Sequence, residues 1–268
     1  MNGRRIRVEH TVLAVVGGLL VTFLVVPVLA LFIRATDFGQ GLRHPLVWPA
    51  LRLSLMTTGL SLVVVVVLGT PLAWSLARAQ GRLARAVETA VQLPIVIPPA
   101  VAGVAMLLAF GRRGLFAGIL YPDGWSISFT TCAVVMAEVF VSAPFFVQAA
   151  TSAFRRIDPS LVVVARTFGA PPLRVFFRVA LPLAAPGLLA GAAMSWARAL
   201  GEFGATLMFA GNLQGQTQTL PLAIYTALES DMRAAQALSI VLVVVAFALL
   251  LFVRAALRRS TERGEPTL

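Results

Sequence analysis

Charged residues are scarce in this sequence. They make up 12% of its 268 residues, whereas hydrophobic residues make up 59% and the mean hydropathy is +0.89. Soluble domains typically contain about 25% charged residues, so this composition excludes an ordinary soluble domain and indicates a membrane protein. Cysteine occurs once, at Cys132, which excludes an intramolecular disulfide and a site of several cysteines for a metal.

Several catalytic motifs are also absent. Histidine occurs only at His10 and His44, and the sequence contains neither H-E-x-x-H nor G-x-S-x-G, which excludes the common hydrolytic sites. It has no G-x-x-x-x-G-K-[ST] loop either, so the chain cannot bind ATP in the usual P-loop manner. The net charge of +11 comes from arginines that cluster between apolar runs, without the continuous basic face that nucleic-acid binding needs.

Long hydrophobic runs dominate what is present. A bilayer core of about 30 Å requires roughly 20 helical residues, because no backbone polar group can stay unpaired in hydrocarbon. The sequence therefore predicts an all-α membrane protein with six transmembrane helices. They are expected at residues 11–33, 53–77, 91–110, 128–150, 186–209 and 237–257.

The arginines predict the orientation, because cytoplasmic connections retain positive charge. Most arginines lie within residues 4–7, 78–85, 155–178 and 254–263, which all fall on one side of the six predicted spans. Both termini and the long loop of residues 155–185 are therefore expected in the cytoplasm.

This loop reads as two short helices. "RRIDPSLVVVARTFGAPP" predicts a helix with Asp158 as its N-cap and Pro159 at its first position, ending near Gly169 and Ala170. "PPLRVFFRVALP" predicts a second helix, with apolar side chains on one face and arginines on the other. Such a pair fits a groove on a partner protein, or it serves only as an interfacial loop that holds orientation.

The loop resembles the cytoplasmic signature loop of binding-protein-dependent ABC importer permeases. That pattern is Glu-Ala-Ala, three residues, Gly, nine residues, Ile, one residue and Leu-Pro. The matching positions here are Val163, Val164, Ala165, Gly169, Val179, Leu181 and Pro182. The resemblance implies a type I importer fold, with coupling helices that dock into an ATPase subunit. The glutamate position is Val163, which departs from the pattern and puts one polar docking contact in doubt.

A second stretch is similar to the permeases of molybdate, tungstate and sulfate importers. "GEFGATLMFAGN" followed by "TQTLPLAIYTAL" resembles the molybdate branch most, and the similarity covers residues 51–257. It implies a homodimeric pore in the bacterial cytoplasmic membrane, two ATPase subunits that use ATP and Mg, and an extracytoplasmic oxyanion-binding protein. This chain itself would bind no cofactor. Residues 1–50 would form an N-terminal segment with the first span, and residues 258–268 a cytoplasmic tail.

Arg198 and Glu202 lie in the fifth predicted span, four residues apart and hence on one helical face. They indicate either a positive potential along the anion path or a structural ion pair. We favour the ion pair, because a pore that binds its anion tightly would not release it. Gly201 and Gly204 are compatible with close helix packing and with gating motion.

Three prolines, Pro94, Pro98 and Pro99, interrupt the third predicted span. Proline frees backbone carbonyls, so the segment either lines a cavity or forms a static kink. An ion-coupled secondary transporter and a membrane enzyme or assembly factor are the alternative classes. The former requires inverted internal repeats, which we do not detect.

Overall fold

The computed structural model describes residues 2–35, 37–121 and 125–262, and the regular structure of these residues is entirely helical. The elements are α1 (Asn2–Ile33), α2 (Phe38–Gly41), α3 (Val47–Arg78), α4 (Arg82–Val96), α5 (Pro99–Phe110), α6 (Ala117–Leu120), α7 (Thr131–Arg155), α8 (Pro159–Thr167), α9 (Pro172–Val175), the π-helical turn η1 (Phe176–Ala180), α10 (Leu181–Leu200), α11 (Gly204–Ala210), α12 (Leu220–Ser230) and α13 (Met232–Glu262). The prediction of an all-α fold is confirmed. Residues 263–268 of the predicted tail lie outside the described residues.

Within the described ranges, five helical segments are long and apolar enough to cross a membrane. They are Leu13–Ile33, Val47–Arg78, Thr131–Arg155, Pro172–Leu200 and Met232–Phe252. The pair α4 and α5 passes the same test only when taken together, and its two helices are bent by 116°. The count therefore reaches the predicted six when this bent pair is one span.

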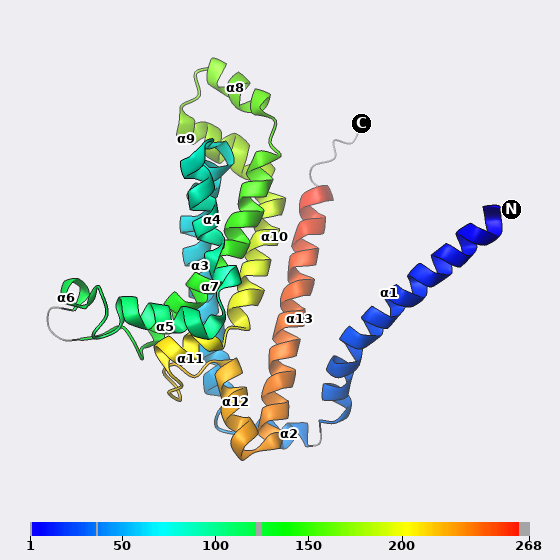
Figure 1. The fold of residues 1–268 in the computed structure, drawn as a ribbon, viewed down its shortest axis with the longest axis vertical. Coiled ribbons are helices and arrows are strands. Elements are labelled where there is room, and N and C mark those ends of the chain that lie inside the picture. Colours follow the sequence, from blue (N-terminus) through cyan, green and yellow to red (C-terminus); the bar gives the residue numbers. More distant parts are fainter. Residues whose placement is uncertain (1, 36, 122–124, 263–268) are drawn as a thin grey trace.

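Helices α3, α7 and α10 run side by side and form the centre of the bundle (Figure 1). Small residues allow α7 and α10 to approach closely. A Cβ added at Gly191 would lie 2.8 Å from the Cβ of Ala149 and 3.3 Å from the carbonyl oxygen of Phe146. Tight van der Waals packing of this kind holds helices together where lipid removes the hydrophobic driving force.

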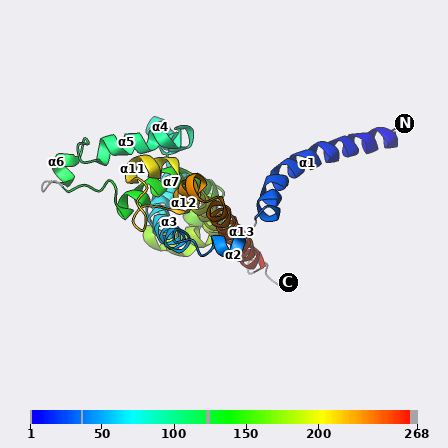
Figure 2. The same cartoon turned by 90° about the horizontal axis from the view of Figure 1, so that it is seen from below.

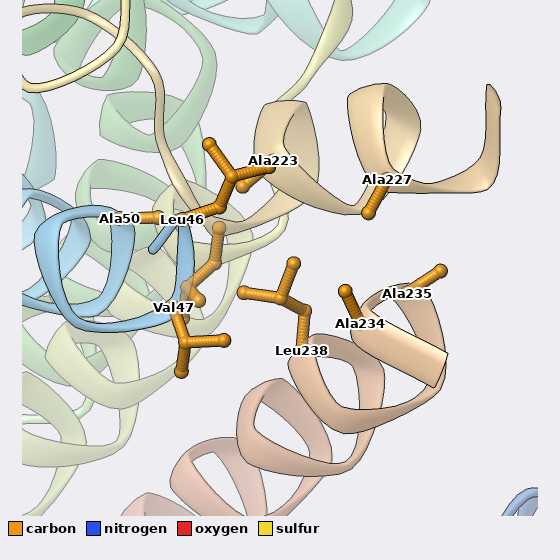
Figure 3. Close-up of a cluster of buried hydrophobic side chains, with 9 residues drawn as sticks. Leu46, Val47, Ala50, Ala223, Ala227, Ala234, Ala235 and Leu238 are labelled. Atoms are coloured by element: carbon orange, nitrogen blue, oxygen red, sulfur yellow. The ribbon is translucent and has the colours of Figure 1, made fainter. Parts of the chain in front are cut away.

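A second apolar cluster joins the start of α3 to α12 and α13 (Figure 3). Leu46, Val47 and Leu238 interdigitate there with alanines of α12 and α13. Helix α12 was not among the predicted spans, because its 11 residues are too few to cross a bilayer. It lies at the end of the bundle opposite α8 and α9 (Figure 1).

Two segments depart from the central bundle. Helices α5 and α11 pack against each other and run across the direction of α7 and α10 (Figure 1). Helix α1 extends away from the other helices (Figures 1 and 2), and none of its residues from Leu13 to Ile33 is buried. Its apolar side chains are therefore free to contact lipid or another chain.

Candidate functional site

Arg198 and Glu202 form an ion pair at the end of α10. The Nη1 atom of Arg198 lies 2.7 Å from Oε2 of Glu202, and the two side chains are 27% and 1% exposed. Their spacing predicted that they could pair, and the structure confirms it. The contact is a single close approach of charges, since Oε2 makes no aligned hydrogen bond. The arginine therefore does not form the two-point fork that guanidinium groups make with carboxylates.

Glu202 also holds the start of the next helix. Its Oε1 accepts a hydrogen bond of 2.6 Å from the backbone N–H of Ala205, in the first turn of α11. A carboxylate at a helix N-terminus and a cation in the last turn of a helix both interact favourably with the helix dipole. The Arg198–Glu202 pair meets both conditions at once, because α10 ends where α11 begins.

The predicted span of residues 186–209 is wrong in one respect, because the helix does not continue beyond Leu200. The backbone leaves helical geometry from Gly201 to Phe203 and resumes at Gly204. The carboxylate of Glu202 replaces part of the interrupted hydrogen-bond ladder. The hydrogen bond from the N–H of Ala205 can form only at such a break, because an unbroken helix leaves no free N–H groups in its interior.

Gly204 lies where α11 touches α5. A Cβ at this position would lie 3.0 Å from the Cβ of Pro99, so the residue serves close helix packing. Gly103 of α5 is tighter still, since an added Cβ would lie 2.7 Å from the carbonyl oxygen of Ala205. Gly201 differs, because the nearest atom to an added Cβ is 3.7 Å away.

The three prolines of the third predicted span have separate positions. Pro94 lies inside α4, whereas Pro98 is the N-cap of α5 and Pro99 its first residue. The bend of 116° thus falls at Ile97 and Pro98. Proline is well tolerated in a first helical turn because its missing N–H would be unpaired there anyway. The pore-lining role of this bend stays a prediction.

A polar stripe on α3 faces Glu138 of α7. The buried carboxyl group of Glu138 accepts hydrogen bonds from Thr57, at 2.8 Å, and from Ser61, at 2.7 Å. Thr58 accepts one of 2.9 Å from the indole N–H of Trp196 in α10. Glu138 and its partners were not identified in the sequence analysis above. The periodicity of Ser and Thr at positions 54, 57, 58 and 61 was the available signal.

The first predicted loop helix is confirmed as α8. The carboxylate of Asp158 accepts a hydrogen bond of 2.8 Å from the N–H of Ser160, and this bond lowers the pKa of Asp158. Helix α8 ends before Gly169, whose φ of +77° belongs to the left-handed region that glycine adopts without strain. Ala165 lies within α8, and Ala170 follows the turn. Val163, at the position of the family's glutamate, is 58% exposed.

The second loop helix differs from its prediction, because it is continuous with the fifth span. Helix α9 passes through η1, which contains Val179, directly into α10, which begins with Leu181 and Pro182. The N–H of Leu181 bonds to the carbonyl of Phe176, five residues earlier. This wider turn accommodates Pro182, which lacks an N–H and needs space for its ring.

In the part of the chain that the structure describes, no group of three or more His, Cys, Asp and Glu side chains could hold a metal ion. The polar groups brought together within the bundle are instead the Arg198–Glu202 ion pair and the carboxyl group of Glu138 with its hydroxyl partners. These buried groups can hold helices in register within the membrane.

The family comparison matches residues 66–263 to the binding-protein-dependent transport system inner membrane component. The chain therefore belongs to this family, the membrane-embedded permease subunits of ABC importers. A molybdenum transport system permease protein, ModB, of Mycobacterium tuberculosis is 46% identical over 244 residues, which cover 90% of this chain and 92% of the relative. ModB of Escherichia coli is 36% identical over 204 residues, covering 76% and 89%.

Solved structures share the fold. A bacterial alginate ABC transporter in complex with its alginate-bound periplasmic protein has a TM-score of 0.75 at 20% identity, and the match covers 96% of each chain. The inward-facing MetNI methionine ABC transporter has a TM-score of 0.61 at 20% identity, covering 84% of this chain and 99% of that chain. The expected type I importer fold is thereby supported over nearly the whole length.

Proposed function

We propose that this chain is the pore-forming permease subunit of an ATP-driven molybdate importer. The observation that carries the proposal is the 46% identity to a molybdenum transport permease along 90% of the chain. Tungstate and sulfate are the alternative substrates. Molybdate and tungstate are tetrahedral dianions of similar size, so the partner binding protein, rather than the pore, is expected to select between oxyanions.

The proposed assembly contains two copies of this chain, two ATPase subunits and one extracytoplasmic oxyanion-binding protein. ATP and Mg are used by the ATPase subunits, since this chain has no P-loop. Both termini and α8 would lie on the cytoplasmic side, in agreement with the distribution of arginines.

In this proposal the loop around Gly169 transmits the ATPase cycle. Helix α8 and its exposed Val163 would dock on the ATPase, with the turn at Gly169 and Ala170 as the pivot. Because α9, η1 and α10 form one continuous helical segment, displacement of the loop would shift α10 as a rod. ATP binding would open the cavity outward, and hydrolysis would return it to the inward-facing state.

The Arg198–Glu202 pair is the candidate for the translocation path, whereas the hydroxyls of α3 at positions 54, 57, 58 and 61 are buried between helices. Arg198 keeps 27% of its side chain exposed, so its charge can act on a passing anion while Glu202 moderates its affinity. A moderated site agrees with transport, because an anion held too tightly would stop the cycle.

The test is uptake of radiolabelled molybdate by proteoliposomes that contain the complete complex and its binding protein. We expect uptake that requires ATP and is reduced by excess molybdate or tungstate but not by sulfate. The control is the same complex with the P-loop lysine of its ATPase changed to alanine. Uptake of sulfate but not of molybdate would refute molybdate as the substrate. Uptake that follows an ion gradient without the ATPase would support a secondary transporter instead.

A further inference from the structure

An apolar groove of about 580 Å³ lies between α3 and the segment formed by α9 and η1. Its walls include Val67, Pro71 and Trp74 from α3 and Leu173 and Phe177 from the other side. Leu173 and Phe177 are 72% and 58% exposed, so this apolar surface has no cover within the described chain. Both the size and the lining are typical of a ligand pocket, for which roughly 300–1,000 Å³ is usual.

A basic pocket of about 420 Å³ adjoins this groove. Trp74 belongs to both, and the pocket adds Arg78 from the end of α3, Arg155 from the end of α7 and Arg166 from α8. The indole ring of Trp74 is fixed between the groove and the pocket by Phe154 and Phe176, whose ring centroids lie 5.2 and 5.4 Å away. The two cavities therefore meet at one rigid side chain.

The arginines of this pocket differ in how their charges are compensated. Arg155 donates hydrogen bonds of 3.1 and 3.0 Å to the two carboxylate oxygens of Glu88. Arg78 stacks on Trp74, with its Cζ atom 3.5 Å from the ring centroid. Among the described residues, neither Arg78 nor Arg166 has an acidic partner within ion-pair distance. Two positive charges are thus held around one pocket without a counter-ion from the described residues.

We propose that the groove and the pocket together bind one anionic phospholipid. Its phosphate would lie between Arg78 and Arg166, and one acyl chain would follow the apolar wall from Trp74 to Val67. The location agrees with this occupant, because α3 and α7 both end at the pocket and the ends of spans lie at headgroup depth. Basic pockets between helices at this depth suit lipid phosphates. The bound lipid bridges α3 to α8, and hence the bundle to the loop.

A free oxyanion or an acidic segment of the ATPase would satisfy the charges but leave the apolar groove empty. A second copy of this chain could fill the groove but, being rich in arginine, offers few acids for the pocket. An anionic lipid is the occupant whose chemistry matches both parts.

The test uses the complex with its ATPase in nanodiscs that contain brominated phosphatidylglycerol or brominated phosphatidylcholine. Bromine quenches nearby tryptophans, and subtraction of the Trp74→Phe variant isolates the signal of Trp74. We expect stronger quenching by the anionic lipid. The double variant Arg78→Gln with Arg166→Gln should weaken its binding about 25-fold, since each arginine near a lipid surface contributes about fivefold. Arg82→Gln, an exposed arginine outside both cavities, is the matched control.

Equal quenching by the two lipids would overturn the proposal, and so would an unchanged preference in the double variant. Excess inorganic phosphate or molybdate should leave the quenching as it is. Displacement by either would assign the pocket to a free oxyanion. If the permease alone prefers the anionic lipid but the complex does not, the pocket would be assigned to an acidic segment of the ATPase. Melting temperatures of all variants identify any that fail to fold.

Discussion

Loss of Arg198 should destabilise the protein chiefly through what it leaves behind. In Arg198→Met, the carboxylate of Glu202, which is 1% exposed in the parent structure, keeps only the N–H of Ala205 as a partner. Breaking a fully buried pair from one side costs about 3–5 kcal/mol. Because the side chain of Arg198 is 27% exposed, we expect a smaller loss, about 2–3 kcal/mol. For a chain of this size, that corresponds to a decrease in melting temperature of roughly 4–12 °C.

The double variant Arg198→Met with Glu202→Gln should recover most of this loss. The glutamine amide oxygen can still accept the hydrogen bond from Ala205, and no buried charge remains. Replacing Glu202 by Leu in the same background should recover less, because the unpaired N–H costs about 1–3 kcal/mol. Arg198→Lys should be mild, since the observed contact is a single approach of charges.

The assay is thermal unfolding of the detergent-purified permease. Arg233→Met is the matched control. Its ion pair with Asp37 spans 3.6 Å between side chains that are 56% and 52% exposed, and such surface pairs contribute about 0–1 kcal/mol. A double variant that melts no higher than Arg198→Met would refute the reasoning. Molybdate uptake by a stable double variant would assign Arg198 to structure, whereas loss of uptake would assign it to the anion path.

Gly103→Ala should lower the melting temperature, because overpacking at this helix contact costs about 1–3 kcal/mol. Gly201→Ala is the control and should leave the melting temperature unchanged, because the nearest atom to its added Cβ is 3.7 Å away. Equal effects of the two variants in thermal unfolding would contradict this packing. Gly169→Val should uncouple ATP hydrolysis from uptake, whereas Gly169→Asn should stay coupled because asparagine tolerates positive φ; normal uptake by the valine variant would exclude the pivot. Glu138→Gln should unfold close to the parent temperature, and Glu138→Ala should unfold several degrees lower. Equal unfolding temperatures for the two variants would show that the hydrogen bonds from α3 contribute no stability.

Features that depend on local sequence could be predicted. Hydropathy located the long helices, because a span must bury about 20 consecutive residues in hydrocarbon. The Asp158 cap and the turn at Gly169 followed from side-chain and backbone preferences that act within a few residues. The pairing of Arg198 with Glu202 followed from helical periodicity, and it is preserved because the first turn after Leu200 keeps both side chains near each other.

Features that depend on tertiary contacts could not be predicted from the sequence. The end of α10 at Leu200 is stabilised by the contact between Glu202 and α11, and by the packing of α11 on α5 about 100 residues earlier in the sequence. Hydropathy is averaged over many residues and therefore does not detect such a short break in the helix. The partners of Glu138 were equally hidden, because hydroxyls in a span can bond to their own helix. Thr70 does so, donating to the carbonyl of Val66, whereas Thr57 reaches Glu138.

The position of the Arg198–Glu202 pair bears on how the loop and the pore region can be coupled. From Pro172 to Leu200 the chain is one helical segment, so a displacement of the loop is expected to move the far end of α10 as well. At its far end Arg198 contacts Glu202, and Glu202 bonds to the first turn of α11. Helix α11 packs on α5 so closely that an added methyl group at Gly103 would collide with backbone. Tightly packed elements move together rather than deform. A displacement of the loop is therefore expected to reach the crossed pair of short helices through these contacts, and the route passes through the non-helical segment from Gly201 to Phe203.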